Sequence, residues 1–293
     1  MRDVALTGAP RKARAVTARR SWARFFRRRT AVAGAIITAT FLVITVLGFW
    51  VTPYPPTATD YSHTLAPPSL MHPAGTDDFG RDILSRLIAG ARYSLGMGLS
   101  AVTLGAALGS IWGVACAFNG GFFDNISMRV ADILFAFPGI LLAIAIVAVL
   151  GPGLTNVVIA VGVFSVPSFA RLVRAPSLAA MGQEYVHAAR AIGAGGARIM
   201  FRHLLPTALP PIIVYFTLRI GTAILTASAL SFLGLGVQPP TPEWGAMLAS
   251  GRLFINVSPQ LVIAPGVTIS LAVLGFNLLG DGLRDALDPR LRT

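Results

Sequence analysis

Long stretches without a charged residue alternate along this chain with short stretches that hold nearly all of its charge. The charge-free stretches are residues 30–59, 93–123, 133–170, 220–241 and 253–280. Each can hold a helix of about 20 residues, the length that crosses a hydrocarbon core of about 30 Å. The third is long enough for two helices, and Gly151-Pro152-Gly153 interrupts it. The pattern predicts six transmembrane helices, near residues 31–51, 94–118, 131–150, 154–171, 208–234 and 259–279.

Composition supports an all-α, polytopic membrane protein. The 293 residues are 54% hydrophobic and 12% charged, whereas a soluble domain carries about 25% charged residues. Ten of the 24 basic residues precede Ala31, which favours a cytoplasmic N-terminus over a nucleic-acid-binding surface. An even number of spans places the C-terminus on the same side. The basic region and the apolar run after it are both too long for a cleaved signal peptide.

This topology divides the chain into parts. A basic cytoplasmic tail (1–30) leads into a first transmembrane helix (31–51) and an extracytoplasmic loop (52–92). A core of five helices (93–280) follows, and a cytoplasmic tail (281–293) ends the chain. Within the core, residues 171–206 fall in the cytoplasm, where five arginines face one glutamate. Gly105, Gly109 and Gly113 lie four residues apart in the second span and predict a close approach to another helix.

A polar segment at residues 183–206 separates two apolar runs. Its first part predicts a short helix from Glu184 to Ile192 with one apolar stripe, formed by Tyr185, Ala188, Ala189 and Ile192. Gly193 ends that helix, because glycine takes the left-handed conformation of a helix stop. A second short helix is expected from Ala197 to Leu205, and Pro206 opens the next span. From these residues alone, a docking site for a partner and a passive helix at the lipid interface are equally good interpretations.

A few other residues are candidates for function. Arg219 lies near the middle of the fifth span, where an arginine is costly unless it faces water, a partner or a substrate. A structural pairing is the simpler explanation for it. The alternative is that it binds a substrate carboxylate. Glu243 and Trp244, in the last extracytoplasmic loop, are candidates for contact with a delivery protein. Asp132 is one turn from Arg129, which favours an ion pair between them.

The chain lacks the residues that an ATPase or a metalloenzyme needs. Its only lysine is Lys12, and no glycine-rich sequence precedes it in the spacing of a phosphate-binding loop. The four histidines show no zinc-like spacing. We therefore expect a protein that is not an enzyme and binds no cofactor or metal.

The polar segment resembles the cytoplasmic "EAA" motif of ABC importer permeases, which reads Glu-Ala-Ala, three residues, Gly, nine residues, then Ile-x-Leu-Pro. Ala188, Ala189, Gly193, Leu205 and Pro206 fall in register, while His187 replaces the glutamate and His203 the isoleucine. The resemblance implies a type I importer fold and a helix that docks on an ATP-binding subunit. The residues that it assigns to this coupling are Glu184, His187, Ala188, Ala189, Gly193, His203, Leu205 and Pro206. The substitution at His187 removes any salt bridge made by the usual glutamate.

Three further segments resemble the second permease of dipeptide and oligopeptide importers. They span residues 75–92, 231–245 and 277–289. Within that family, residues 135–139 and the apolar run after them most resemble the permease that imports glutathione. The resemblance implies a bacterial inner-membrane subunit that works with a homologous permease, two ATP-binding subunits that use ATP and magnesium, and an extracytoplasmic solute-binding protein. The alternative is a self-sufficient secondary transporter or channel, but that class requires ionisable residues in several spans, and Arg219 is the main one present.

Overall fold

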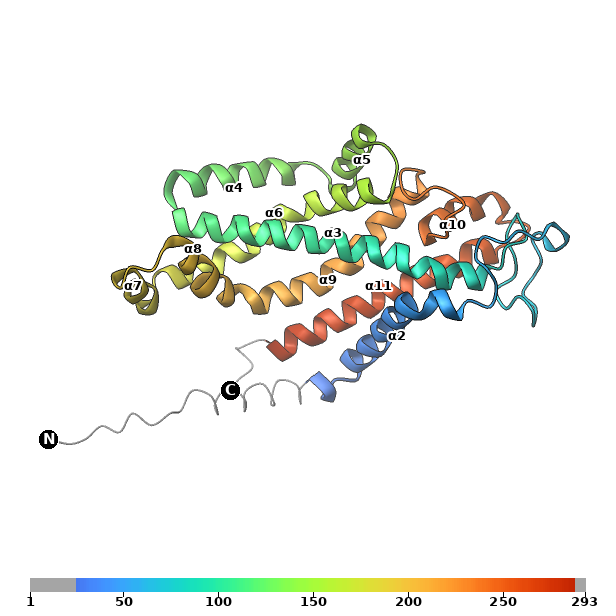
Figure 1. Ribbon diagram of the computed structural model, residues 1–293, viewed down its shortest axis with the longest axis horizontal. Coiled ribbons are helices and arrows are strands. Elements are labelled where there is room, and N and C mark those ends of the chain that lie inside the picture. The colour runs from blue at the N-terminus through green and yellow to red at the C-terminus, as the bar shows by residue number, and fades with distance from the viewer. Residues whose placement is uncertain (1–24, 288–293) are drawn as a thin grey trace.

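The computed structural model describes residues 25–287, so most of the expected N-terminal tail and the last six residues lie outside the described part. The described chain is mostly helical, and its one β-bridge, between Thr76 and Asp82, is isolated. Five helices are long and apolar enough to cross a membrane. They are α2 (Arg29–Val51), α3 (Ile83–Asn119), α6 (Leu154–Met181), α9 (Leu205–Phe232) and α11 (Gln260–Leu287), which run lengthwise through the molecule (Figure 1).

The span expected at 131–150 is not one continuous helix. The structure has two helices there, α4 (Gly121–Ala136) and α5 (Gly139–Leu150), whose axes differ by 92°. The bend falls at Phe137-Pro138, because proline cannot donate the helical hydrogen bond and disfavours the α conformation in the residue before it. Counting this bent pair as one crossing gives six spans, and without it there are five.

Two helices, α3 and α6, extend well beyond the spans predicted for them. α3 has 37 residues, about 55 Å at 1.5 Å per residue, well beyond the roughly 30 Å of a hydrocarbon core. It begins at Ile83 rather than near residue 94, and Asp82 caps it by accepting a hydrogen bond from the Ser85 amide at 2.7 Å. α6 likewise continues past Arg171 to Met181. Hydropathy marks the apolar part of such a helix and leaves out its polar ends.

Close packing of α3 against α6 confirms the approach predicted from the glycine series. A Cβ atom at Gly105 would lie 2.5 Å from the Ser165 Cβ, and one at Gly113 would lie 2.3 Å from the Ala170 carbonyl oxygen. Gly109 faces the Val166 carbonyl oxygen at 2.5 Å in the same way. The glycines therefore let the two backbones touch.

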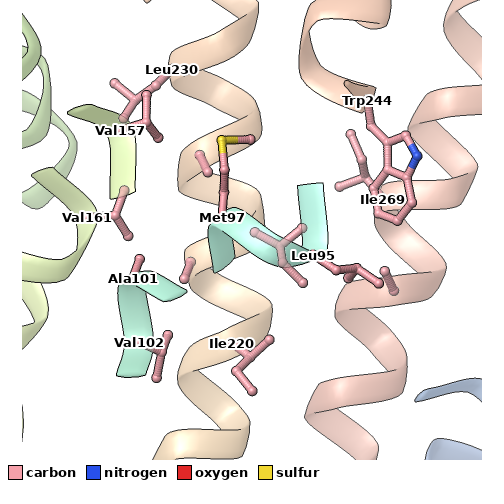
Figure 2. Packing of buried hydrophobic residues seen from close by; sticks show 14 of the residues in the cluster. Leu95, Met97, Ala101, Val102, Val157, Val161, Ile220, Leu230, Trp244 and Ile269 are labelled. Carbon is pink, nitrogen blue, oxygen red and sulfur yellow. The ribbon is translucent and has the colours of Figure 1, made fainter. Parts of the chain in front are cut away.

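The hydrophobic core is centred on α3. In Figure 2, Val157 and Val161 of α6 lie to the left and Ile269 of α11 lies to the right. Met97 and Leu95 of α3 lie between them, next to α9. Trp244 fills the space near Ile269. Its indole Nε1 donates to the Leu87 carbonyl at 3.0 Å, so its polar atom is satisfied inside the core.

The two ends of the bundle differ. At one end lie the loop before α3, with a short 3-10 turn (Tyr61–His63), and the short helix α10 (Trp244–Gly251), which a 3-10 turn (Arg252–Phe254) follows (Figure 1). At the other end lie α7 (Glu184–Ala191) and α8 (Gly196–Ile199) (Figure 1). The start of α2 and the end of α11 are joined by an ion pair between Arg28 and Asp285.

Candidate functional site

The short helix α7 is held against the end of the bundle by two small apolar side chains. Val186 is 0% exposed, and Ala189, one turn later, is buried as well. Val186 belongs to a cluster with side chains from the ends of three long helices, among them Val114 of α3, Val173 of α6 and Ala208 of α9. α7 is therefore seated on the core rather than attached only by its connections.

Gly193 ends α7 as predicted. The Ala194 amide donates to the Ala189 carbonyl at 3.0 Å, and the Gly193 amide donates to the Arg190 carbonyl at 2.9 Å. This pair of bonds is the Schellman pattern, which requires a left-handed residue at the helix stop. Gly193 has φ +82° and nothing within 4 Å of a Cβ position. A larger residue there is thus opposed by backbone conformation and not by lack of space.

The predicted apolar stripe of α7 is divided between its inner and outer faces. Of the four residues expected on it, only Ala189 is buried, and Val186 takes the place of the others as the second anchor. Tyr185 is 45% exposed, Ile192 is 86% exposed, and Ala188 and His187 also lie on the surface. An isoleucine this exposed at the end of the molecule, beside an alanine, forms an apolar spot that a partner can cover.

Three arginines that lie in α7 or close to it in the chain are also exposed. Arg190 on α7 stacks over the ring of Phe118 at 5.7 Å, and Gly196 is small because a Cβ there would lie 2.9 Å from the same ring. Arg198 and Arg202 are exposed nearby, and Glu184 is exposed at the start of α7. This end of the molecule thus exposes both apolar and positively charged side chains.

The second short helix, expected at Ala197–Leu205, is not a separate element. α8 continues through a π-helical turn (Met200–Leu204) into α9, so one helix runs from Gly196 to Phe232. The wide turn lies just before Pro206, which has no amide hydrogen to donate to the carbonyl four residues earlier. The Leu205 amide instead bonds to the Met200 carbonyl. His203 falls within this turn, with its ring 6.1 Å from that of Tyr185.

Glu243 and Trp244 lie at the opposite end of the bundle, and the structure corrects their expected role. Both side chains are 0% exposed, so neither is available to a delivery protein. Glu243 instead caps α10, because its carboxylate accepts from the amides of Gly245 at 3.0 Å and Ala246 at 2.8 Å, and from Ser94 Oγ at 3.0 Å. Burial raises the pKa of Glu243 despite these hydrogen bonds.

Two ion pairs that the sequence did not suggest join α4 to α6. Asp132 pairs with Arg171 of α6 and not with Arg129, which corrects the expected local pair. One end of α4 holds a second pair, in which both oxygens of Asp124 bond to Arg174, with Oδ1 2.6 Å from Nε. The partners are 39 and 50 residues apart in the chain, so no local pattern reveals them.

The structure thus brings together the candidates at residues 184–206 and leaves the others apart. Arg219 lies along α9, 14 residues from its start at Leu205, and contacts α6. A helical bundle with membrane-spanning dimensions, broken at α4–α5 and carrying a short exposed helix at one end, is typical of a membrane permease.

Comparison with known proteins agrees. Residues 105–293 match the family described as the binding-protein-dependent transport system inner membrane component, and residues 17–68 match the N-terminal transmembrane domain of oligopeptide transport permease C. The chain belongs to the first of these families, the permeases of ABC importers.

Individual relatives are similar over nearly the whole chain. The glutathione transport system permease protein GsiD of Escherichia coli O1:K1 is 50% identical over 92% of this chain and 90% of its own length. The protein of the same description from Shigella boydii serotype 4 is 49% identical over the same shares. A chain of the MetNI methionine ABC transporter, solved in inward-facing conformations, has a TM-score of 0.55 at 20% identity. It covers 69% of this chain and 96% of its own, which supports the fold.

Proposed function

We propose that this chain is the permease subunit of an importer that carries small peptides, glutathione among them, across the bacterial inner membrane. Its partners are a homologous permease, two ATP-binding subunits and an extracytoplasmic binding protein. The membrane-permease family and the similarity to glutathione permeases support the substrate class.

In this proposal the end of the bundle that carries α7 faces the cytoplasm. The arginines around α7, together with those at the start of α2, favour that side under the positive-inside rule. Both described ends of the chain then lie in the cytoplasm, and the loop before α3 and α10 face the binding protein.

The observation that carries the proposal is the exposure of Ile192 and Tyr185 on a helix whose inner face is firmly packed. α7 docks in a groove of the ATP-binding subunit, with Ala188 allowing close approach. Closure of the ATP-binding subunits on ATP then displaces α7, and this displacement moves the spans between inward-open and outward-open arrangements. Since His187 stands where the family has a glutamate, docking here rests on apolar contact more than on a carboxylate.

The test replaces Ile192 by arginine in the complex reconstituted with its ATP-binding subunits. Leu70→Arg is the matched control, because Leu70 is 103% exposed at the other end of the molecule. Burying an unpaired charge costs several kcal/mol, so we expect Ile192→Arg to weaken co-purification of the ATP-binding subunits at least about tenfold. Leu70→Arg should leave it unchanged. Equal retention by the two variants contradicts α7 as the docking helix, and transport by this chain alone in proteoliposomes supports the secondary-transporter alternative.

A further inference from the structure

A single charged side chain lies deep in the membrane-spanning part of α9. Arg219 is 14 residues from the start of α9 and 13 from its end, about 20 Å along the helix in either direction. No ion pair within residues 25–287 includes it. An arginine at this depth is costly and is retained where it faces water, a partner chain or a ligand.

The surroundings of Arg219 orient the guanidinium without neutralising it. Nη2 donates to the Ser165 Oγ at 3.2 Å, and Ser165 itself donates to the Val161 carbonyl at 2.9 Å. The rings of Phe164 and Tyr215 lie 5.5 Å and 5.8 Å from Cζ. Nε is buried and has no hydrogen-bond partner in the described part of the chain. One hydroxyl and two ring faces leave most of the five N–H donors of an arginine for another acceptor.

Three polar residues share a face of α9 with Arg219, on which apolar Ile212 and Ala223 also lie. Tyr215, Thr222 and Thr226 follow at helical spacing and fall within an arc of about 60° around Arg219. Both threonines bond to carbonyls of their own helix, at 2.9 Å, so they are satisfied without a partner. Thr222 is exposed on the isolated chain. A polar stripe of this kind on a spanning helix faces a water-filled path in preference to lipid.

We propose that this face of α9, defined by Tyr215, Arg219, Thr222 and Thr226, lines the translocation path, and that Arg219 holds the carboxylate of a passing peptide. The inference rests on the proposed function and adds a residue that selects the chemical class of the solute. A planar guanidinium matches a carboxylate with two parallel hydrogen bonds, and release occurs when the path opens to water on the other side. The neighbouring threonines provide neutral hydroxyls along the same path.

The experiment compares Arg219→Met with Arg219→Lys in the complete importer complex in proteoliposomes. Uptake of radiolabelled glutathione and of the dipeptide Ala-Ala is measured together with the ATPase rate stimulated by the binding protein. Methionine keeps the packing against Phe164 and Tyr215 but removes the charge, whereas lysine keeps the charge. Leu225→Ala, on another face of α9, is the control, because Leu225 is exposed and apolar.

Loss of a hydrogen-bonded charge partner corresponds to about 1.5–3 kcal/mol, so Arg219→Met should lower peptide uptake about 10- to 100-fold. Its stimulated ATPase rate and melting temperature should stay at or above those of the wild type, and Leu225→Ala should keep most of the uptake. Arg219→Lys should fall between the two, because lysine keeps the charge but not the paired donors of the guanidinium. Uptake by Arg219→Met within twofold of the wild type overturns the proposal. A parallel fall in the ATPase rate or in stability overturns it as well, because that result shows a structural role. If the wild-type complex imports neither peptide, the proposed function itself fails. The wild-type measurement shows this without any of the variants, so the two failures can be told apart.

Discussion

The contact between α3 and α6 makes a graded prediction about glycine substitution. Ordinary contact for a Cβ atom begins near 3.4 Å, and a Cβ at Gly113 would lie only 2.3 Å from the Ala170 carbonyl oxygen. Because the obstructing atom belongs to the backbone, no side-chain rotation relieves the overlap. The two helices must separate locally by roughly 1 Å, which loosens neighbouring contacts along the pair.

Gly96 is the matched control on the same helix. A Cβ atom there meets nothing within 4 Å, and exchange of a mid-helix glycine for alanine gains about 0.5–1 kcal/mol from backbone entropy. Gly113→Ala receives the same gain but pays about 1–3 kcal/mol for overpacking. The two alanine variants should therefore differ by about 1–3 kcal/mol in the free energy of unfolding.

The assay is thermal unfolding of the purified protein in detergent, followed by near-ultraviolet circular dichroism. One kcal/mol corresponds to roughly 2–4 °C for chains of 150–250 residues, so Gly113→Ala should melt several degrees below Gly96→Ala. Gly113→Leu should fail to assemble. If Gly113→Ala melts with or above Gly96→Ala, the close backbone contact between α3 and α6 is refuted.

Three further predictions concern charged residues. Glu243→Ala removes the acceptor of two amides and one hydroxyl and should lower the free energy of unfolding by about 1–3 kcal/mol, measured by chemical denaturation. Because burial raises the pKa of Glu243, the wild type should lose stability as pH rises through that raised pKa, and Glu243→Gln should remove this dependence. Hydrogen bonds from Ser62 and His63 lower the pKa of Asp60 to about 2. The ionised Asp60 therefore stabilises the folded state above its ordinary pKa near 4, and this stabilisation is lost as pH falls toward 2. Asp60→Asn should make the melting temperature less dependent on pH between these two values. Asp124→Asn breaks the two-bond pair to α6 and should speed hydrogen exchange of α4 amides while leaving those of α3 unchanged.

The spans were predictable because a helix that crosses a bilayer needs about 20 apolar residues, and such runs can be recognised in the sequence without knowing how the helices pack. The helix α7 was predictable for a related reason, since a polar helix with a glycine stop stands out between two apolar runs. The bend at Phe137-Pro138 was missed although Pro138 is visible in the sequence. Proline is tolerated within several other helices of this chain, Pro167 of α6 among them, so its presence alone does not locate a break.

Contacts between distant segments could not be predicted. Glu243 has the polarity and loop position of a surface residue, and only the fold brings it to Ser94, 149 residues earlier. Asp132 had a basic neighbour one turn away, yet its partner is Arg171, because α6 passes beside α4 at that level. The glycine series predicted a tight helix contact but carried no information about which helix supplies the other side.

In the proposed importer, a force on α7 reaches the middle of the membrane through the packing of α6. Two residues connect the end of α6 at Met181 to the start of α7 at Glu184. Because this connection is so short, a displacement of α7 also displaces the end of α6. α6 cannot slide independently, because its backbone touches the glycines of α3 and its arginines hold α4. It also carries Ser165, the hydroxyl that positions Arg219. Under this proposal a shift of α6 changes the surroundings of Arg219 at the same time as it moves α3 and α4, so that these contacts connect α7 to the polar face of α9.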